Sequence, residues 1–437
     1  MQTTSILCLL QRKSGHPRRL LLAVLAGCLA TSTVAAASSF RVGSFTKSTA
    51  AAPASQAIAH GLGETPRALI LWTGGRTTES FSTDFRFALG FTDGTTDRAL
   101  AAASRDGLED SDASRRLAAK ALTIVQWSEA LLAEADLTSW DSTDFTLNWT
   151  TNNATAYVIH YLAIGGGVSA RVVDWTTRES PGSQSVATVG FAPDLVIHAH
   201  VGGFTSAIPA SVAVAGVGLG VMTADGDEWA LATLSRDASE RSDTQRYQQT
   251  DACLVVINTD QLVDKEASFV SMDGDGFTVD FSTAEAGAYR VLSLALRGLE
   301  ANAGSFSKAT AAAPASQAVT GVGFRPRALL LSSFQGIAQA SPVAHARFGL
   351  GATDGTTEGS SAFQDSNGAE PASVDGIDKT SKLFLKVDNA TPSIDAEADL
   401  TSLDSDGFTL RWSGNDAVAA ELLYLALGAQ RRIMFVD

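Results

Sequence analysis

Hydrophobic and polar residues alternate along several short segments of this chain. Every second residue is apolar over 85–91 and 145–149, and the pattern returns over 217–221, 277–281, 346–352 and 408–412. A period of two is typical of β-strands with one covered face. Residues 159–164 are apolar at both phases, which predicts a central strand paired with the apolar segment 67–72.

Turn signals follow the alternating segments at matching places. Asp93-Gly94, Asp225-Gly226 and Asp354-Gly355 each come directly after one of them. Asp-Gly is favoured in tight turns because glycine adopts positive φ without a steric penalty. The pattern therefore predicts that equivalent strands are joined by equivalent turns.

Long stretches of sequence recur along the chain. "GSFTKSTAAAPASQA" begins at Gly43 and "GSFSKATAAAPASQA" begins at Gly304, 261 residues later. A third, more divergent copy lies between them, because "SMDGDGFTVDF" matches segments near 145 and 408. We expect repeats at 40–166, 167–299 and 300–428, followed by a tail at 429–437.

Each repeat is expected to fold as an all-β, antiparallel two-sheet sandwich resembling a jelly roll. Short strands and glycine-rich turns in units of this length favour that architecture. One stretch, "DSDASRRLAAKAL" at 110–122, is helix-like in pattern, and we interpret it as a loop or a short helix.

The first 37 residues have the layout of a secretory signal peptide. Four basic residues precede an apolar run, and small residues lead to Ala37. We expect cleavage after Ala37 and a secreted, extracellular or periplasmic protein. A lipid anchor at Cys28, within Leu25-Ala26-Gly27-Cys28, is an alternative, and Arg18-Arg19 weakly resembles a twin-arginine signal.

Charge narrows the range of partners. Removal of the four basic leader residues changes the net charge from −15 to −19. Nucleic-acid binding requires clustered Lys and Arg, so an acidic chain disfavours it. No segment after the leader is apolar enough to span a bilayer, and Cys253 is the one cysteine left, so an internal disulfide is excluded.

The late motif Asp-x-Asp-Gly-Phe-Thr, carried at 273–278 and 404–409, accompanies an early "GFRPRALLL". Together they resemble β-sandwich modules of phage tail and virion-surface proteins and of secreted bacterial proteins. Asp144 departs from the motif in the first repeat, where the others have glycine. The resemblance covers nearly all of the chain after the leader and implies architecture and location more than activity.

Candidate ligand-binding residues are few. Trp140 precedes a turn, at a place where the other repeats carry Met272 and Leu403, and we expect it to be partly exposed. "SRD" occurs twice, which makes candidates of Arg105, Asp106, Arg236 and Asp237. The third repeat has Asp365-Ser366-Asn367 at this place, which argues against a role common to all three repeats.

Metal sites are weakly indicated. Asp273, Asp275, Asp404 and Asp406 are candidate Ca²⁺ ligands, because hard cations prefer carboxylate oxygens. Turn formation is the simpler explanation, since the closing glutamate of an EF-hand is missing. His198 and His200, two residues apart on a strand, would share one face, but no third ligand lies nearby in the sequence.

The case for an enzyme depends on rows of acids. Glu134 and Asp136, and the alternating set 395, 397 and 399, place carboxylates on one strand face, at a spacing near that of inverting glycosidases. The second repeat has only Glu266. His160 beside Tyr161 invites a catalytic interpretation, but leucines occupy the equivalent places. No nucleophile elbow, phosphate loop or zinc motif is present.

Three functions follow as expectations. The first is a secreted or surface-anchored, non-catalytic protein whose repeats form a rod for adhesion or for binding a ligand, a glycan or another surface protein. The second is a secreted carbohydrate-active enzyme. The third is a structural subunit that resembles phage tail-fibre modules.

Overall fold

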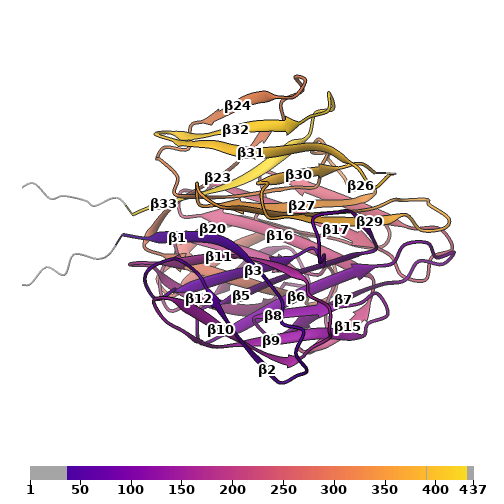
Figure 1. The fold of residues 1–437 in the computed structure, drawn as a ribbon, viewed down its shortest axis with the longest axis horizontal. Helices are drawn as coiled ribbons and strands as arrows, with labels where there is room; N and C mark the ends of the chain where they lie inside the picture. The colour runs from indigo at the N-terminus through magenta and orange to yellow at the C-terminus, as the bar shows by residue number, and fades with distance from the viewer. Residues whose placement is uncertain (1–36, 390, 431–437) are drawn as a thin grey trace, which may run out of the picture. The chain divides into compact units, whose positions relative to one another are not determined.

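The computed structural model describes residues 37–389 and 391–430, so the predicted signal peptide, with Cys28 and Arg18-Arg19, lies outside the described residues apart from Ala37. The described part is all-β and has no helix. Consequently, none of its segments is a helix able to cross a membrane. Strands belong to three seven-stranded and three four-stranded sheets, and all pairings are antiparallel (Figure 1).

The strands fall into three successive sets, called repeats 1, 2 and 3. Repeat 1 contains β1 (Ser39–Thr46), β2 (Ala54–Ala59), β3 (Ala68–Thr73), β4 (Ser82–Thr83), β5 (Phe85–Thr92), β6 (Asp97–Ser104), β7 (Ala113–Ala118), β8 (Leu122–Val125), β9 (Leu131–Trp140), β10 (Asp144–Thr151) and β11 (Val158–Gly165). Repeat 2 contains β12 (Ser169–Thr176), β13 (Gly182–Val186), β14 (Leu195–His200), β15 (Ala210–Ala213), β16 (Ala215–Thr223), β17 (Glu228–Ser235), β18 (Thr244–Gln249), β19 (Leu254–Ile257), β20 (Val263–Asp273), β21 (Gly276–Ala284) and β22 (Arg290–Arg297). Repeat 3 contains β23 (Leu299–Ser307), β24 (Ala315–Thr320), β25 (Ala328–Ser333), β26 (Val343–Ala344), β27 (Ala346–Thr353), β28 (Glu358–Asp365), β29 (Val374–Lys379), β30 (Phe384–Val387), β31 (Ile394–Asp404), β32 (Gly407–Gly414) and β33 (Glu421–Ala429).

Each four-stranded sheet packs on one face of a seven-stranded sheet, which gives the predicted sandwich. In repeat 1 the small sheet has the order β2-β10-β9-β8 and the large one β1-β11-β3-β5-β6-β7-β15. Phe145, Leu147 and Trp149 of β10 are fully buried against Leu69 and Leu71 of β3. The predicted pairing of the apolar strands β11 and β3 is confirmed, and so is the core position of Trp149.

The seventh strand of each large sheet comes from a different repeat. β15 of repeat 2 pairs with β7, β26 of repeat 3 pairs with β18, and β4 of repeat 1 pairs with β29. Figure 1 shows β15 alongside β7. The exchange runs 1 to 3, 2 to 1 and 3 to 2, so it closes a cycle. We call β4, β15 and β26 the arms.

A left-handed residue joins each arm to the strand that follows it. Asp84, Val214 and His345 have φ of 66°, 74° and 72°. Their backbone N–H groups donate to the carbonyls of Val374, Ala113 and Thr244, each in the repeat that receives the arm. Because L-residues rarely adopt this region, the three hinges mark where the chain crosses between repeats.

The second face of each large sheet is buried against the other two repeats. One continuous apolar cluster includes Phe87, Leu219 and Phe348, one from each repeat, and Phe85 stacks on Phe363 with ring centroids 4.1 Å apart. The expectation of modules arranged along a rod is therefore wrong. Burial on both faces also explains why β3 is apolar from Ala68 to Trp72.

The helix-like segment at 110–122 is also a correction, because it forms strand β7 and the start of β8. Arg115 and Arg116 resemble an exposed helical face in the sequence. In the structure they lie between β6 and the arm β15, where pairing on both sides determines the conformation. The predicted glycine turns are confirmed, with φ of 82°, 89° and 85° at Gly94, Gly226 and Gly355.

Candidate functional site

A groove of about 580 Å³ lies where repeat 1 gives way to repeat 2, and Trp140 is part of its wall. Trp140 ends β9 and is half-buried, as expected from the sequence. Its indole lies against the β5–β6 turn, where a Cβ on Gly94 would come within 2.2 Å of the ring. Gly94 therefore serves both the turn and the position of the indole.

Two charged side chains, Asp93 and Arg67, line this groove, and they differ in whether the fold already uses their hydrogen-bonding groups. Asp93 is committed to the fold, since it accepts from the backbone N–H of Thr96 at 2.7 Å and of Val172 in repeat 2 at 2.8 Å. Arg67 is exposed, and no hydrogen bond or ion pair of its guanidinium is present among the described residues. The groove thus offers an aromatic face and a free cation. Arg67 was not predicted, because only the fold places it opposite Trp140.

The equivalent groove between repeats 2 and 3 is smaller and has different chemistry. It measures about 340 Å³ and is lined by Asp194 and Phe324 among others. Asp194 takes the place of Arg67, and its carboxylate accepts from the N–H of Gly298 at 2.6 Å. At the third junction, Arg41 forms an ion pair with Asp354 at 3.2 Å. The first groove is therefore the one with both tryptophan and arginine.

The "SRD" aspartates fasten the repeats to one another. Asp106 accepts from the N–H of Val374 in repeat 3, and Asp237 accepts from that of Ala113 in repeat 1, each at 2.8 Å. Asn367 does the same for Thr244 of repeat 2 at 2.9 Å. Repeat 3 thus makes the same contact between repeats without the "SRD" sequence, because an amide oxygen accepts as a carboxylate does.

The two "SRD" arginines lie at the surface. Arg236 forms an ion pair with Asp243 at 3.5 Å while its side chain stays 51% exposed. Arg105 is exposed and lies over the ring of Trp127, with 5.2 Å from its guanidinium carbon to the ring centroid. The structure brings neither of them to the groove that contains Trp140. Their binding role stays a prediction.

Three of the four aspartates proposed for Ca²⁺ have carboxylates that accept hydrogen bonds in hairpin turns. Asp273 accepts from the hydroxyls of Ser271 and Thr278, and Asp404 accepts in the same way from Ser402 and Thr409. These bonds lower the pKa of Asp404. Asp406 accepts from the N–H of Gly323 at 2.6 Å, and Asp275 is exposed. Over 37–389 and 391–430, no group of three or more His, Cys, Asp or Glu could hold a metal ion.

The histidines are buried rather than available to a ligand. Burial lowers the pKa of His198 to about 3 and that of His200 to about 4, so both are neutral at neutral pH. His198 hydrogen-bonds Ser293 at 2.8 Å. His160 is fully buried, stacks on Trp72 and lies 3.8 Å from Asp378 of repeat 3. A substrate could not reach His160 there.

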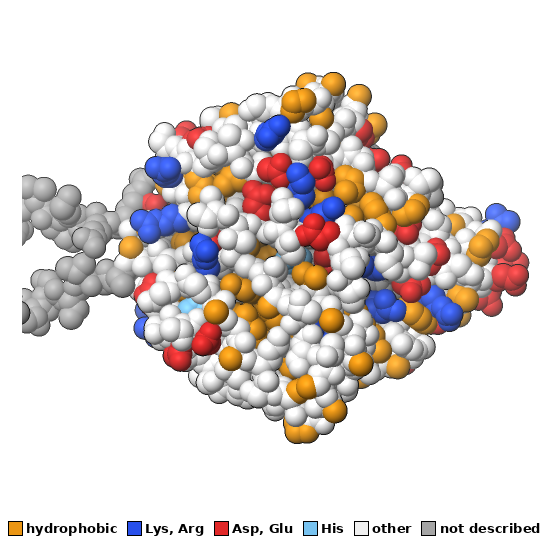
Figure 2. Space-filling view, viewed as in Figure 1, with side chains coloured by type: hydrophobic (Ala, Val, Ile, Leu, Met, Phe, Trp, Pro, Cys, Tyr) orange, Lys and Arg blue, Asp and Glu red, His pale blue; other side chains and the backbone are white. Residues whose placement is uncertain are grey.

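The rows of acids are neutralised by basic partners. Glu134 forms an ion pair with Arg116 at 2.7 Å, and Asp136 with Lys120 at 2.9 Å. In repeat 3, Asp395 pairs with Lys386, while Glu397 and Asp399 share Lys382. Figure 2 shows acidic and basic side chains side by side on the face that carries β30 and β31. Such pairing suits a stable sheet surface better than an acid–base pair, which needs a free carboxylate.

No protein-family model matches this chain, and a search of the curated proteins found no similar sequence. The geometry of the grooves therefore carries the functional argument.

Proposed function

We propose that this protein is a non-catalytic binding protein, secreted or anchored at a surface, and that the groove between repeats 1 and 2 takes a carbohydrate. The observation that carries the proposal is the pairing of a half-buried indole, Trp140, with the free guanidinium of Arg67 in one open groove. An aromatic face packs on the apolar face of a sugar ring, and a guanidinium donates to its hydroxyls.

Binding of glycans by the chain without its leader tests this proposal. A glycan array with the unaltered protein identifies the ligand, and titration calorimetry then gives its affinity. We expect Trp140→Ala to weaken binding at least tenfold, as for an aromatic anchor in a groove. Met272→Ala is the matched control, because Met272 occupies the same register position in repeat 2. Unchanged affinity in Trp140→Ala, or no glycan bound, would reject the groove as a sugar site.

Hydrolysis of polysaccharides distinguishes the enzyme alternative. Release of reducing ends that is abolished by Glu134→Gln or Glu397→Gln would support a carbohydrate-active enzyme. We expect no release, because both carboxylates are tied to cations.

A second candidate function is that of a structural subunit, in line with the resemblance to phage tail and virion-surface modules. The cyclic exchange of arms favours it, since three equivalent repeats around one core present matching surfaces to a threefold partner. Light scattering after size-exclusion chromatography tests this candidate. Large, uniform particles support it, and a monomer at all concentrations contradicts it.

A further inference from the structure

A second concave site lies in repeat 1, outside the groove that contains Trp140. It measures about 300 Å³ and is lined by Arg76 and Arg86 together with hydroxyl-bearing side chains, among them Thr77, Thr78, Ser82 and Thr155. We call it the arginine pocket. It lies between the arm β4 and the loop before β11, so segments far apart in the sequence form it.

Arg86 brings a poorly neutralised charge to this pocket. Its guanidinium lies over the ring of Trp127, with 4.4 Å from its carbon to the ring centroid. Its single ion pair, with Asp84, is long at 3.6 Å, and its buried Nε has no hydrogen-bond partner among the residues placed by the structure. Arginine in this state retains donors for an additional acceptor.

Arg76 adds a second positive charge. Its side chain is almost fully buried, and its guanidinium donates to four backbone carbonyls, those of Gly74, Ser82, Thr83 and Asp84. No carboxylate of the described residues lies within ion-pair distance of its guanidinium. Burial lowers the pKa of Arg76, as expected when the charge is held by neutral acceptors.

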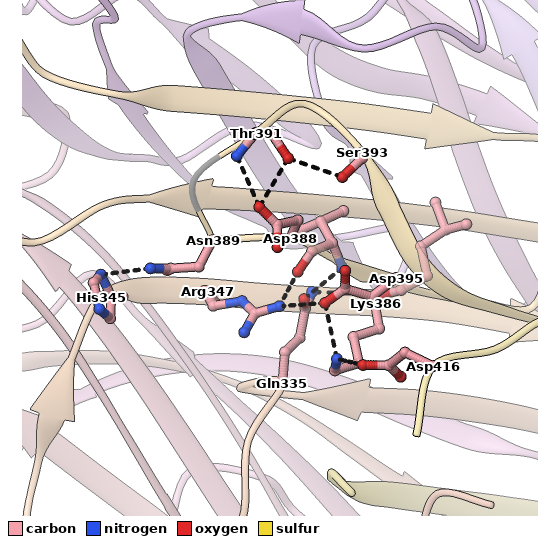
Figure 3. Close-up of polar contacts among 12 residues, drawn as sticks. Gln335, His345, Arg347, Lys386, Asp388, Asn389, Thr391, Ser393, Asp395 and Asp416 are labelled. Carbon is pink, nitrogen blue, oxygen red and sulfur yellow. Dashed lines mark hydrogen bonds and ion pairs between the residues drawn. The ribbon is translucent and has the colours of Figure 1, made fainter. Parts of the chain in front are cut away.

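The same place in repeat 3 shows what a neutralised version looks like. Arg347 occupies the register position of Arg86, and it pairs with Asp395 at 3.5 Å. Figure 3 shows Arg347 and Lys386 both directed at Asp395, with Lys386 also reaching Asp416. In repeat 1, Leu132 stands where repeat 3 has Asp395. Repeat 1 therefore keeps the arginine and lacks the acid.

We propose that the arginine pocket binds the carboxylate of an acidic monosaccharide, such as a uronic acid. The Arg86 guanidinium has donors for an oxyanion, the buried charge of Arg76 lies beside it, and the surrounding threonine and serine hydroxyls suit those of a sugar ring. The volume suits one ring and not a polymer in its full width. This site is independent of the proposed function, because it shares no residue with the groove that contains Trp140.

Titration calorimetry of the chain without its leader, at constant ionic strength, tests the assignment. Glucuronate, glucose, acetate and sulfate are the probes. We expect glucuronate to bind at least tenfold more tightly than any of the other three. Sulfate binding equal to glucuronate would assign a general oxyanion site instead and overturn the sugar assignment, and equal binding of glucose would overturn the role of the charge.

Variants localise the site. Arg86→Gln removes the charge, and Thr78→Glu places a like charge at the exposed rim without altering the core; each should weaken glucuronate binding at least tenfold. Arg411→Gln is the matched control and should change nothing, because Arg411 of repeat 3 is exposed and has no ion pair with any residue that the structure describes. Trp140→Ala should leave glucuronate binding intact, which separates this site from the proposed glycan groove. Equal loss in Arg411→Gln, or no loss in Thr78→Glu, would refute the proposal.

Discussion

Repeats 1 and 3 have the same strands in the same register, yet the surroundings of one equivalent arginine, Arg86 in repeat 1 and Arg347 in repeat 3, differ between them. In repeat 1 Arg86 lines the open arginine pocket together with Arg76. In repeat 3 the corresponding Arg347 belongs to an ion-pair network in which Lys386 bridges Asp395 and Asp416 (Figure 3). The sandwich therefore accommodates an arginine without the acid in repeat 1 and an arginine within an ion-pair network in repeat 3.

Repeat 2 offers an intermediate case. Its counterpart of the arginine pocket has a volume of about 190 Å³ and is lined by Arg115 and Tyr289 among others. Gly216 replaces Arg86 there, and a Cβ at that glycine would lie 2.7 Å from the carbonyl oxygen of Val201. The backbone of Val201, in the same repeat, therefore excludes a large side chain at position 216.

A guanidinium group lies beside each arm. At two arms it belongs to the strand that receives the arm, and at the third it belongs to the repeat that donates the arm. Arg115 donates to the carbonyl of Val201 at 2.8 Å, and Arg246 donates to that of Ala344 at 2.8 Å. At the third arm the equivalent strand carries Gly376, and Arg76 reaches across from the other repeat to within 2.9 Å of where its Cβ would be. One cation per arm is thus kept, although its source differs.

The largest change in stability is expected from breaking the ion-pair network that Lys386 forms with Asp395 and Asp416 in repeat 3. Lys386→Met leaves Asp395 and Asp416 with one cation fewer in a site where the lysine side chain is 3% exposed. Removing one partner of a buried pair costs about 3 kcal/mol of unfolding free energy. Urea denaturation measures it. The double variant Lys386→Ile, Asp395→Leu installs the residues of repeat 1 and should recover at least half of the loss. Equal losses in both variants would contradict the comparison.

A second effect concerns the place where the last residues of β6, β17 and β28 meet. Ser104 and Ser235 have Asp365 as their counterpart, and Ser104 donates to the Asp365 carboxylate at 2.7 Å. Burial raises the pKa of Asp365 to about 6, above its value in the unfolded chain, and nearby Asp106 adds to the shift. The contribution of protonated Asp365 to the free energy of unfolding is therefore fully present at low pH, and it is lost as the pH rises through about 6.

Asp365→Ser should remove this dependence. We expect a gain of up to about 3 kcal/mol at pH 7.5 and little change at pH 3, because a shift of one pKa unit corresponds to about 1.4 kcal/mol. Thermal unfolding at several pH values measures it. Part of the dependence of stability on pH should remain in this variant, because burial also raises the pKa of Glu358 to about 7. A variant less stable than the parent at pH 7.5 would contradict the account.

The smallest effect is expected at the arm hinges. Asp84 and His345 are polar, whereas Val214 is β-branched at φ 74°. A β-branched residue is strained there, and asparagine is tolerated far better. Val214→Asn should raise the free energy of unfolding by about 1 kcal/mol, and Asp84→Asn, the control at the same hinge in repeat 1, should change it by less than about 0.5 kcal/mol. A loss of stability in Val214→Asn would show that its packing outweighs the strain.

The sequence predicted what depends on local pattern and on repetition. Alternation located β10 with its buried Trp149, and Asp-Gly located the turns. It did not predict the arms, because β4 and β26 are only two residues long and pair with strands of another repeat. Such short segments have no periodicity to recognise. The role of Asn367 was missed because an amide and a carboxylate look unlike in sequence while accepting the same bond.

Site prediction had the same limit. Trp140 was recognisable as an aromatic residue at a place where the other repeats have aliphatic ones. Arg67, Arg76 and Arg86 gave no signal, because the grooves that they line are formed by neighbours that only the fold brings close.

The pairing of β4 with β29 has a consequence for biosynthesis. A chain emerging from a ribosome or a translocation pore exposes residues 82–83 long before residues 375–376 exist to receive them. The leading third of the polypeptide must then wait, partly unsatisfied, until almost the entire chain has emerged. The large sheet of repeat 3 is consequently complete only when the first and last thirds of the polypeptide are both present, so a product truncated before residue 375 leaves β4 without its partner strand.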